Sequence, residues 1–179
     1  MQKKNYAAII VLFVVLSGIG IGLWKQQAKY TVDVDITPEQ RQTFEQRVEE
    51  WDEKIDSTPA GEQPNPDYFI EKARYQEYLG QYGAAIKTLQ SLFDYYENSS
   101  AAWNNLAKLY EKVGRPRKAI ENYQKLIDVF ELYQFRLDIA WNYYRLGNIE
   151  KAREVYQQYQ SETGGRDEEL EYYFEQAAQ

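Results

Sequence analysis

Acid–base chemistry in this 179-residue chain would have to rest on carboxylates, because the chain contains neither histidine nor cysteine. That composition excludes thiolate nucleophiles, disulfides, zinc sites built on Cys or His, and triads that use imidazole as the base. The 28 acidic residues form no recognisable catalytic constellation, and no Gly-x-x-x-x-Gly-Lys phosphate loop is present. We therefore expect a protein that binds rather than an enzyme, and one that needs no cofactor or metal.

The charge of the chain is distributed unevenly along its length. The net charge is -7, but residues 1–29 carry four lysines and no acid, whereas residues 30–65 carry ten acids against three bases. Residues 66–166 are nearly neutral, and residues 167–179 carry five acids and no base. Basic residues that neutralise phosphates supply most non-specific nucleic-acid affinity. We therefore expect no nucleic-acid partner.

A regular pattern of small and aromatic residues organises the middle of the chain. Gly80, Gly114 and Gly147 recur 34 and then 33 residues apart. The clearest copy reads Trp103-x2-Leu106-Ala107-x2-Tyr110-x3-Gly114-x4-Ala119-x3-Tyr123. A fixed period of this length indicates a stacked array, because one such unit cannot bury its apolar face alone.

The residue types and their spacing resemble the tetratricopeptide repeat (TPR) family, in which each unit is a pair of antiparallel helices. The resemblance implies an all-α solenoid with units at 66–99, 100–132 and 133–166. It also implies that the chain binds another polypeptide in a concave groove.

The outer units depart from the family pattern. Lys72 and Gln76 in the first unit replace an apolar and an aromatic residue, and Arg136 stands where the second unit has Trp103. The proline that often closes a unit is missing, and Glu97 and Glu131 fall at those places. We expect these departures to weaken the match of the outer units and not the fold.

The resemblance implies that the first helix of every unit lines the groove. The expected lining is Ile70, Arg74, Glu77 and Tyr78 from the first unit, Asn104, Asn105, Lys108 and Lys112 from the second, and Leu137, Asp138, Trp141, Tyr144 and Arg145 from the third. Tyr and Trp beside Arg is a composition typical of interface hot spots. Trp141 has an alternative, which is to pack on the last helix. The carboxylate clamp of some family members is absent, since only Asn105 matches it and Asp138 would repel a carboxylate.

The N-terminal region predicts a membrane anchor in residues 1–25. Residues 7–24 carry no charge and would reach about 27 Å as a helix, close to the thickness of a bilayer core. Tyr6 and Trp24 stand at the two ends, where amphipathic rings favour the headgroup level. The slight excess of positive charge before the run predicts a single-pass protein of the cell membrane, with a cytoplasmic N-terminus and repeats outside the cytoplasm.

Two alternatives to a simple anchor stay open. Cleavage near Gly20 would release a secreted soluble binding module. Gly18 and Gly22 form a Gly-x-x-x-Gly pair that could bring two membrane helices together, so that the chain would be a homo-oligomeric membrane scaffold.

Residues 26–65 form an acidic neck, in which residues 30–36 alternate as a short strand would. Residues 37–55 read as an amphipathic helix that begins with a capping box of Thr37 and Gln40. Its apolar stripe could pack on the first repeat, pair with its copy in an oligomer, or contact a partner; the stripe is Phe44, Val48, Trp51 and Ile55. Residues 56–66 hold three prolines and a glycine and read as a flexible linker.

Residues 167–179 predict a capping helix that closes the array with Leu170, Phe174 and Ala177 on one face. An acidic interaction tail is the alternative. A basic group at the turn of the second unit could meet an acidic partner or stay solvated; it comprises Lys112, Arg115, Arg117 and Lys118. Taken together, the sequence predicts a membrane-anchored adaptor or scaffold that binds a polypeptide and assists envelope protein assembly or translocation.

Overall fold

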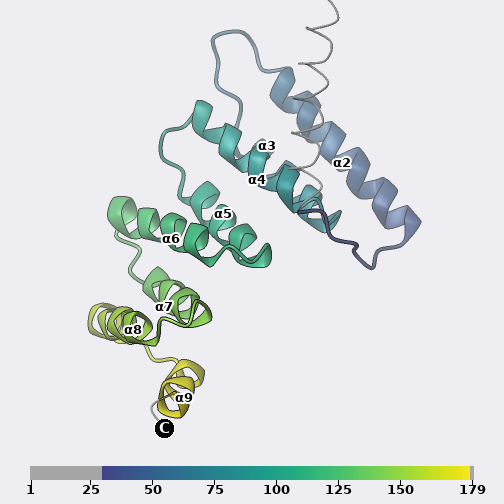
Figure 1. The fold of residues 1–179 in the computed structure, drawn as a ribbon. Coiled ribbons are helices and arrows are strands. Elements are labelled where there is room, and N and C mark those ends of the chain that lie inside the picture. Colours follow the sequence, from purple (N-terminus) through teal and green to yellow (C-terminus); the bar gives the residue numbers. More distant parts are fainter. Residues whose placement is uncertain (1–29, 178–179) are drawn as a thin grey trace, which may run out of the picture.

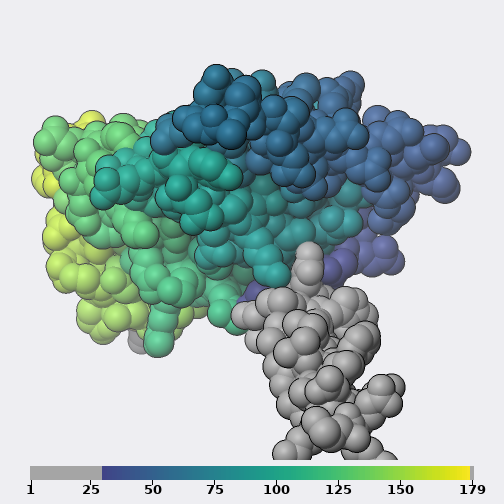
Figure 2. All heavy atoms as spheres, turned by 90° about the horizontal axis from the view of Figure 1, so that it is seen from above, coloured from purple at the N-terminus to yellow at the C-terminus, as the bar shows by residue number. Residues whose placement is uncertain are grey.

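The computed structural model describes residues 30–177, and this part of the chain is a stack of α-helices without strands (Figure 1). The helices are α2 (Pro38–Asp56), α3 (Pro66–Tyr78), α4 (Tyr82–Ser91), α5 (Ser100–Lys112), α6 (Pro116–Phe130), α7 (Phe135–Arg145), α8 (Ile149–Thr163) and α9 (Glu168–Gln176), with a short 3₁₀ turn at Leu92–Asp94. Three antiparallel pairs, α3/α4, α5/α6 and α7/α8, follow one another. Figure 2 shows the α2 end and the C-terminal end on opposite sides of the molecule. The expected all-α solenoid is confirmed.

Small residues let the helices of each pair approach closely. Six alanines at these contacts are at most 3 % exposed, and they are Ala73, Ala85, Ala107, Ala119, Ala140 and Ala152. Large side chains fill the remaining space, with Trp103, Tyr123 and Tyr156 between 1 and 5 % exposed. The core is therefore continuous from one pair to the next, as a solenoid requires.

Glycine ends the first helix of every pair in a left-handed conformation. Gly80, Gly114 and Gly147 have φ angles of 71°, 68° and 73°. Gly80 has a second constraint, because a Cβ atom there would stand 2.1 Å from the carbonyl oxygen of Val32. The backbone of the N-terminal segment thus uses the missing side chain of Gly80 to approach the first turn.

The departures from the repeat pattern have partners within the fold. The buried Gln76 accepts a hydrogen bond from the Thr88 hydroxyl at 2.8 Å. Arg136, in the place of a tryptophan, donates to a Glu162 oxygen on α8 at 2.9 Å. Lys72 pairs with Asp52 of α2. Polar side chains therefore replace apolar contacts in the outer units without being left unsatisfied, which is the condition for burying them.

Helix α2 packs on α3 within the same chain. Thr37 and Gln40 form the predicted capping box, with reciprocal side-chain bonds of 2.9 and 3.2 Å. The Phe44 ring lies 5.3 Å from that of Tyr78, and the Trp51 ring lies 5.6 Å from that of Tyr68. The apolar stripe therefore packs on the first repeat, and each of its residues stays partly exposed.

The segment between α2 and α3 is fixed to the first repeat, and the prediction of a flexible linker is wrong. Gln63 donates from Nε2 to the Tyr95 carbonyl at 2.9 Å, and the Tyr96 hydroxyl donates to the Pro64 carbonyl at 3.0 Å. Pro64 itself is buried. Proline stiffens the backbone and here also contributes a packing surface, so composition alone misjudged the segment.

Residues 30–36 do not form the expected short strand. A single antiparallel bridge joins Thr31 to Gln81, and the Val32 amide donates to the Gly80 carbonyl at 2.9 Å. Next to this bridge in the sequence, the Tyr30 ring lies 5.2 Å from the Arg115 guanidinium. The chain thus enters the array at its glycine turns.

Helix α9 covers the last pair. Leu170 is fully buried and Phe174 is 7 % exposed, and Asp167 caps the helix by accepting from the Leu170 amide at 2.8 Å. Ala177, expected on the buried face, is exposed. No helix within residues 30–177 is long and apolar enough to cross a membrane, and the predicted anchor at 7–24 lies outside the described residues.

Candidate polypeptide groove

The first helices of successive pairs enclose two neighbouring clefts. The first cleft, of about 350 Å³, lies between α3 and α5, and it is lined by Ile70, Glu71, Ala73, Arg74, Glu77, Tyr78, Leu89, Asn105 and Leu109. Five predicted groove residues therefore meet at one place, namely Ile70, Arg74, Glu77, Tyr78 and Asn105. Tyr78 remains 45 % exposed although its ring contacts Phe44 of α2.

The second cleft, of about 540 Å³, lies between α5 and α7. Its lining is Glu111, Lys112, Gly114, Pro116, Asn142 and Arg145. Lys112 and Arg145 are predicted groove residues. The ion pair between Lys112 and Glu77 joins the two clefts, because Glu77 lines the first one. The clefts therefore form one row along α3, α5 and α7.

A polar cluster lies at the α5–α7 boundary. Asn142 is fully buried, and its Nδ2 donates to Glu111 and, at 2.8 Å, to the backbone carbonyl of Asp138. The Asn142 Oδ1 atom and the Tyr123 hydroxyl are buried without a hydrogen-bond partner among the described residues. Arg145 pairs with Glu111 at 3.3 Å.

The surroundings of this cluster disfavour a negative charge on Asp138 beside that of Glu111. Burial, reinforced by the charge of Glu111, raises the pKa of Asp138 from 3.8 to about 6, against the opposing effect of Lys108 and Arg145. Burial also raises the pKa of the Tyr123 hydroxyl, and the charges of Asp138 and Glu111 add to this effect. At the α5–α7 boundary two carboxylates, Asp138 and Glu111, therefore lie close together and are partly shielded from solvent.

Several predicted groove residues are engaged elsewhere. The Trp141 Nε1 atom donates to Asp167 at 3.3 Å, and its ring stands edge-on to Tyr173 of α9 at 6.0 Å. Tyr144 stacks on Tyr173 at 5.3 Å. Of the two roles open for Trp141, packing on the last helix is the one the structure shows, because α9 folds back over this part of α7.

The other predicted residues line neither cleft. Leu137 packs against the main core, and Lys108 is exposed on α5. Asn104 is half-buried, with its Oδ1 atom buried and without a hydrogen-bond partner among residues 30–177. Their predicted contact with a partner remains untested by the fold.

The sequence reasoning missed Asn142 and Tyr123 as site residues. Asn142 falls where the second unit has Leu109, so a polar residue at an apolar repeat position was the available signal. Tyr123 was assigned to the core, which is correct for its ring but overlooks its hydroxyl.

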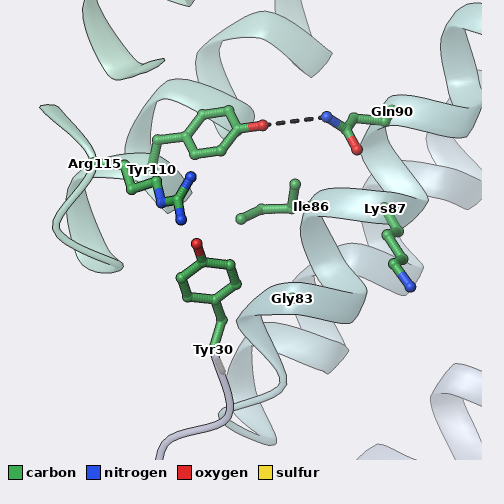
Figure 3. A pocket seen from close by; sticks show the side chains of 7 residues that line it. All are labelled: Tyr30, Gly83, Ile86, Lys87, Gln90, Tyr110 and Arg115. Carbon is green, nitrogen blue, oxygen red and sulfur yellow. Dashed lines mark hydrogen bonds between the residues drawn. The ribbon is translucent and has the colours of Figure 1, made fainter. Parts of the chain in front are cut away.

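A third cavity, of about 250 Å³, lies where the entry segment meets α4 and the α5–α6 turn (Figure 3). The Tyr30 hydroxyl points toward Arg115, whereas the Tyr110 hydroxyl points toward Gln90, whose Nε2 donates to it at 3.2 Å. Burial raises the pKa of Tyr110, although Lys118 and Arg115 oppose the shift. This cavity involves Arg115 of the predicted basic group, and its contacts hold the chain at the glycine turns.

Within residues 30–177 no group of three or more acidic side chains is placed to hold a metal ion. The two clefts offer charged, amide and aromatic side chains.

Comparison with known proteins supports the repeat assignment. The tetratricopeptide repeat model matches residues 70–115 and 104–167, which together exceed half of the chain. The solved structure described as "Crystal structure of MamA" is similar in fold, with a TM-score of 0.56 and 18% identity over 74% of this chain and 77% of that chain. At this identity the likeness concerns the fold alone. A search of curated proteins found no match. The chain therefore belongs to the tetratricopeptide repeat family.

Proposed function

We propose that this protein is an adaptor that holds a segment of another polypeptide in the row of clefts along α3, α5 and α7. The observation that carries the proposal is the adjacency of the two clefts, which the Glu77–Lys112 ion pair joins. An extended segment crossing both would meet Arg74, Tyr78 and Asn105 first and the Asn142 cluster next. Large aromatic rings and arginine near such a surface supply most interface energy in general.

A binding assay on the full chain tests this assignment. A library of fluorescein-labelled random heptapeptides is screened by anisotropy against the protein in detergent. Replacing Tyr78 and Asn105 together by alanine should weaken the selected peptides by at least tenfold, because both side chains line the first cleft. The matched control is Gln157→Ala on the exposed side of α8. Equal binding by both variants would contradict the groove.

We also propose that the array is tethered to a membrane through residues 7–24. Tyr30 is held beside Arg115 at the glycine turns, and five residues, 25–29, separate it from the apolar run. Five residues span at most about 18 Å. An anchor would therefore hold the glycine-turn edge toward the bilayer and leave the opposite edge farther from it. Assistance in envelope assembly or translocation is the role that this arrangement would suit.

Fractionation of cells that produce the full chain tests the tether. The anchored protein should stay in the membrane fraction after carbonate washing, and its N-terminal sequence should begin before Gly18. A soluble product that starts beyond Gly20 would support the secreted alternative. The orientation is tested by adding protease to cells whose outer membrane or cell wall has been removed. Repeats that lie outside the cytoplasm should be cut under these conditions.

A further inference from the structure

The lining of the second cleft includes the acidic side chain of Glu111 and an unused buried acceptor, and Asp138 lies close to Glu111. The Asn142 side chain is fully buried and lines the cleft, and its Oδ1 atom has no hydrogen-bond partner in the described part of the chain. Its amide nitrogen already donates to Glu111 and to the Asp138 backbone. A buried acceptor without a donor costs free energy unless a ligand or water supplies one. Asn142 therefore marks a place that suits a donor group.

The charges around Asn142 define the donor. Glu111 is close enough to Asp138 that its charge raises the pKa of Asp138, and no lysine or arginine nitrogen among residues 30–177 lies within 4.0 Å of the Asp138 carboxylate. Arg145 reaches Glu111 at 3.3 Å, and its side chain is 53% exposed, so it covers the pair from outside. Lys108 acts on Asp138 from beyond 4.0 Å, and Lys112 of the cleft lining is paired with Glu77. A further positive group can therefore approach the Asp138 carboxylate directly.

We propose that the second cleft receives a lysine or arginine side chain of the bound polypeptide. This inference rests on the proposed function, since the side chain comes with a segment lying along the groove. The incoming cation would donate hydrogen bonds to the Glu111 and Asp138 carboxylates and to Asn142 Oδ1, with the Tyr123 hydroxyl beside them. An elongated basic side chain suits a cleft of about 540 Å³ that opens between two helices.

A metal ion suits the site less well. Divalent hard cations take six or more oxygen ligands, usually with several carboxylates. Among the described residues no group of three acidic side chains is placed for this. The site offers two carboxylates and one amide oxygen, which match the three protons of an ammonium group.

A positional-scanning library of labelled heptapeptides, with one residue fixed in each pool, tests the inference on the full chain in detergent. Pools fixed as lysine or arginine should bind roughly tenfold more tightly than pools fixed as norleucine, because norleucine has no proton to donate to the carboxylates and to Asn142 Oδ1. Asp138→Asn, Glu111→Gln and Asn142→Leu should each remove most of this preference. The control Glu121→Gln removes the same charge from an exposed position on α6 and should keep it.

The outcomes separate the inference from the proposed function. Binding of many pools without a preference for basic residues would overturn the basic-side-chain site and leave the groove. A preference retained in both Asp138→Asn and Glu111→Gln would place the recognition elsewhere and overturn it too. Loss of the preference on adding millimolar Ca²⁺ to a chain that keeps its other peptide binding would identify a metal site. Absence of any peptide binding would overturn the proposed function itself.

The second unit has Leu109 at the position equivalent to Asn142, which indicates that the Asn142→Leu variant can fold. Thermal unfolding of the variant checks this.

Discussion

Replacing Asp138 by asparagine should stabilise the protein at neutral pH. Burial and the Glu111 charge raise the pKa of Asp138 from 3.8 to about 6. At 1.36 kcal/mol for each pH unit, keeping this carboxylate ionised costs at most about 3 kcal/mol. Its partial exposure screens part of that cost, and an acid in the first turn of α7 gains about 0.3–1 kcal/mol from the helix dipole. We therefore expect Asp138→Asn to add about 1–2 kcal/mol to the free energy of unfolding.

The pH dependence gives the sharper test. Below about pH 4 both the folded and the unfolded chain protonate Asp138, so the variant and the natural protein should differ little. Between about pH 4 and pH 6 the unfolded chain releases this proton before the folded chain does, and the natural protein loses stability relative to the variant. Above about pH 6 the difference should be constant.

Urea unfolding followed by far-UV circular dichroism at pH 4, 5, 6 and 7.5 measures this difference. Asp94→Asn is the control, because Asp94 is exposed and its replacement should change stability by less than about 0.5 kcal/mol. A variant advantage that is already complete at pH 4, or a variant less stable than the natural protein at pH 7.5, would refute the electrostatic reasoning for the second cleft.

Three further predictions test the fold by the same unfolding assay. Gly80→Ala should lower the free energy of unfolding by about 2–4 kcal/mol, because it adds a clash with the Val32 carbonyl to the strain of a positive φ. Gly114→Ala should lower it by about 1–2 kcal/mol, because nothing lies within 4 Å of the added Cβ. Equal losses would mean that residues 30–36 do not pack against the Gly80 turn. Thr37→Ala removes half of the capping box and should cost about 1 kcal/mol, and no loss would place the start of α2 elsewhere. Thr88→Val leaves the buried Gln76 without its donor and should cost about 1–3 kcal/mol, most of which the added change Gln76→Leu should restore; additive losses would contradict the pairing.

Local rules predicted the helices and their ends well. The capping box at Thr37 and the left-handed glycines are determined by a few neighbouring residues, so a single sequence is enough to place them. The stacking of pairs also follows from the repeat period, because each unit must bury its apolar face on the next. Contacts between residues that are distant in the sequence were harder to predict. The Pro-rich segment looked flexible until Tyr95 and Tyr96, some thirty residues away, were seen to hold it.

The candidate site was predicted in part for the same reason. Family resemblance placed Arg74, Tyr78 and Asn105 on one side, and the structure brings them together in the first cleft. It left two roles open for Trp141, and the choice between them depends on the path of the chain after α8. It also passed over Asn142, whose importance depends on a carboxylate from another helix, Glu111.

The central claim is that one face of the array holds a polypeptide, and photocrosslinking in living cells tests it most directly. A photoreactive residue is placed at Asn105, which lines the first cleft, and in a second strain at Gln157, which is exposed on α8. The account predicts a discrete crosslinked polypeptide from position 105 that disappears when Tyr78→Ala is added, and none from position 157. The same crosslinked product from both positions, or a product at 105 that persists with Tyr78→Ala, would contradict it.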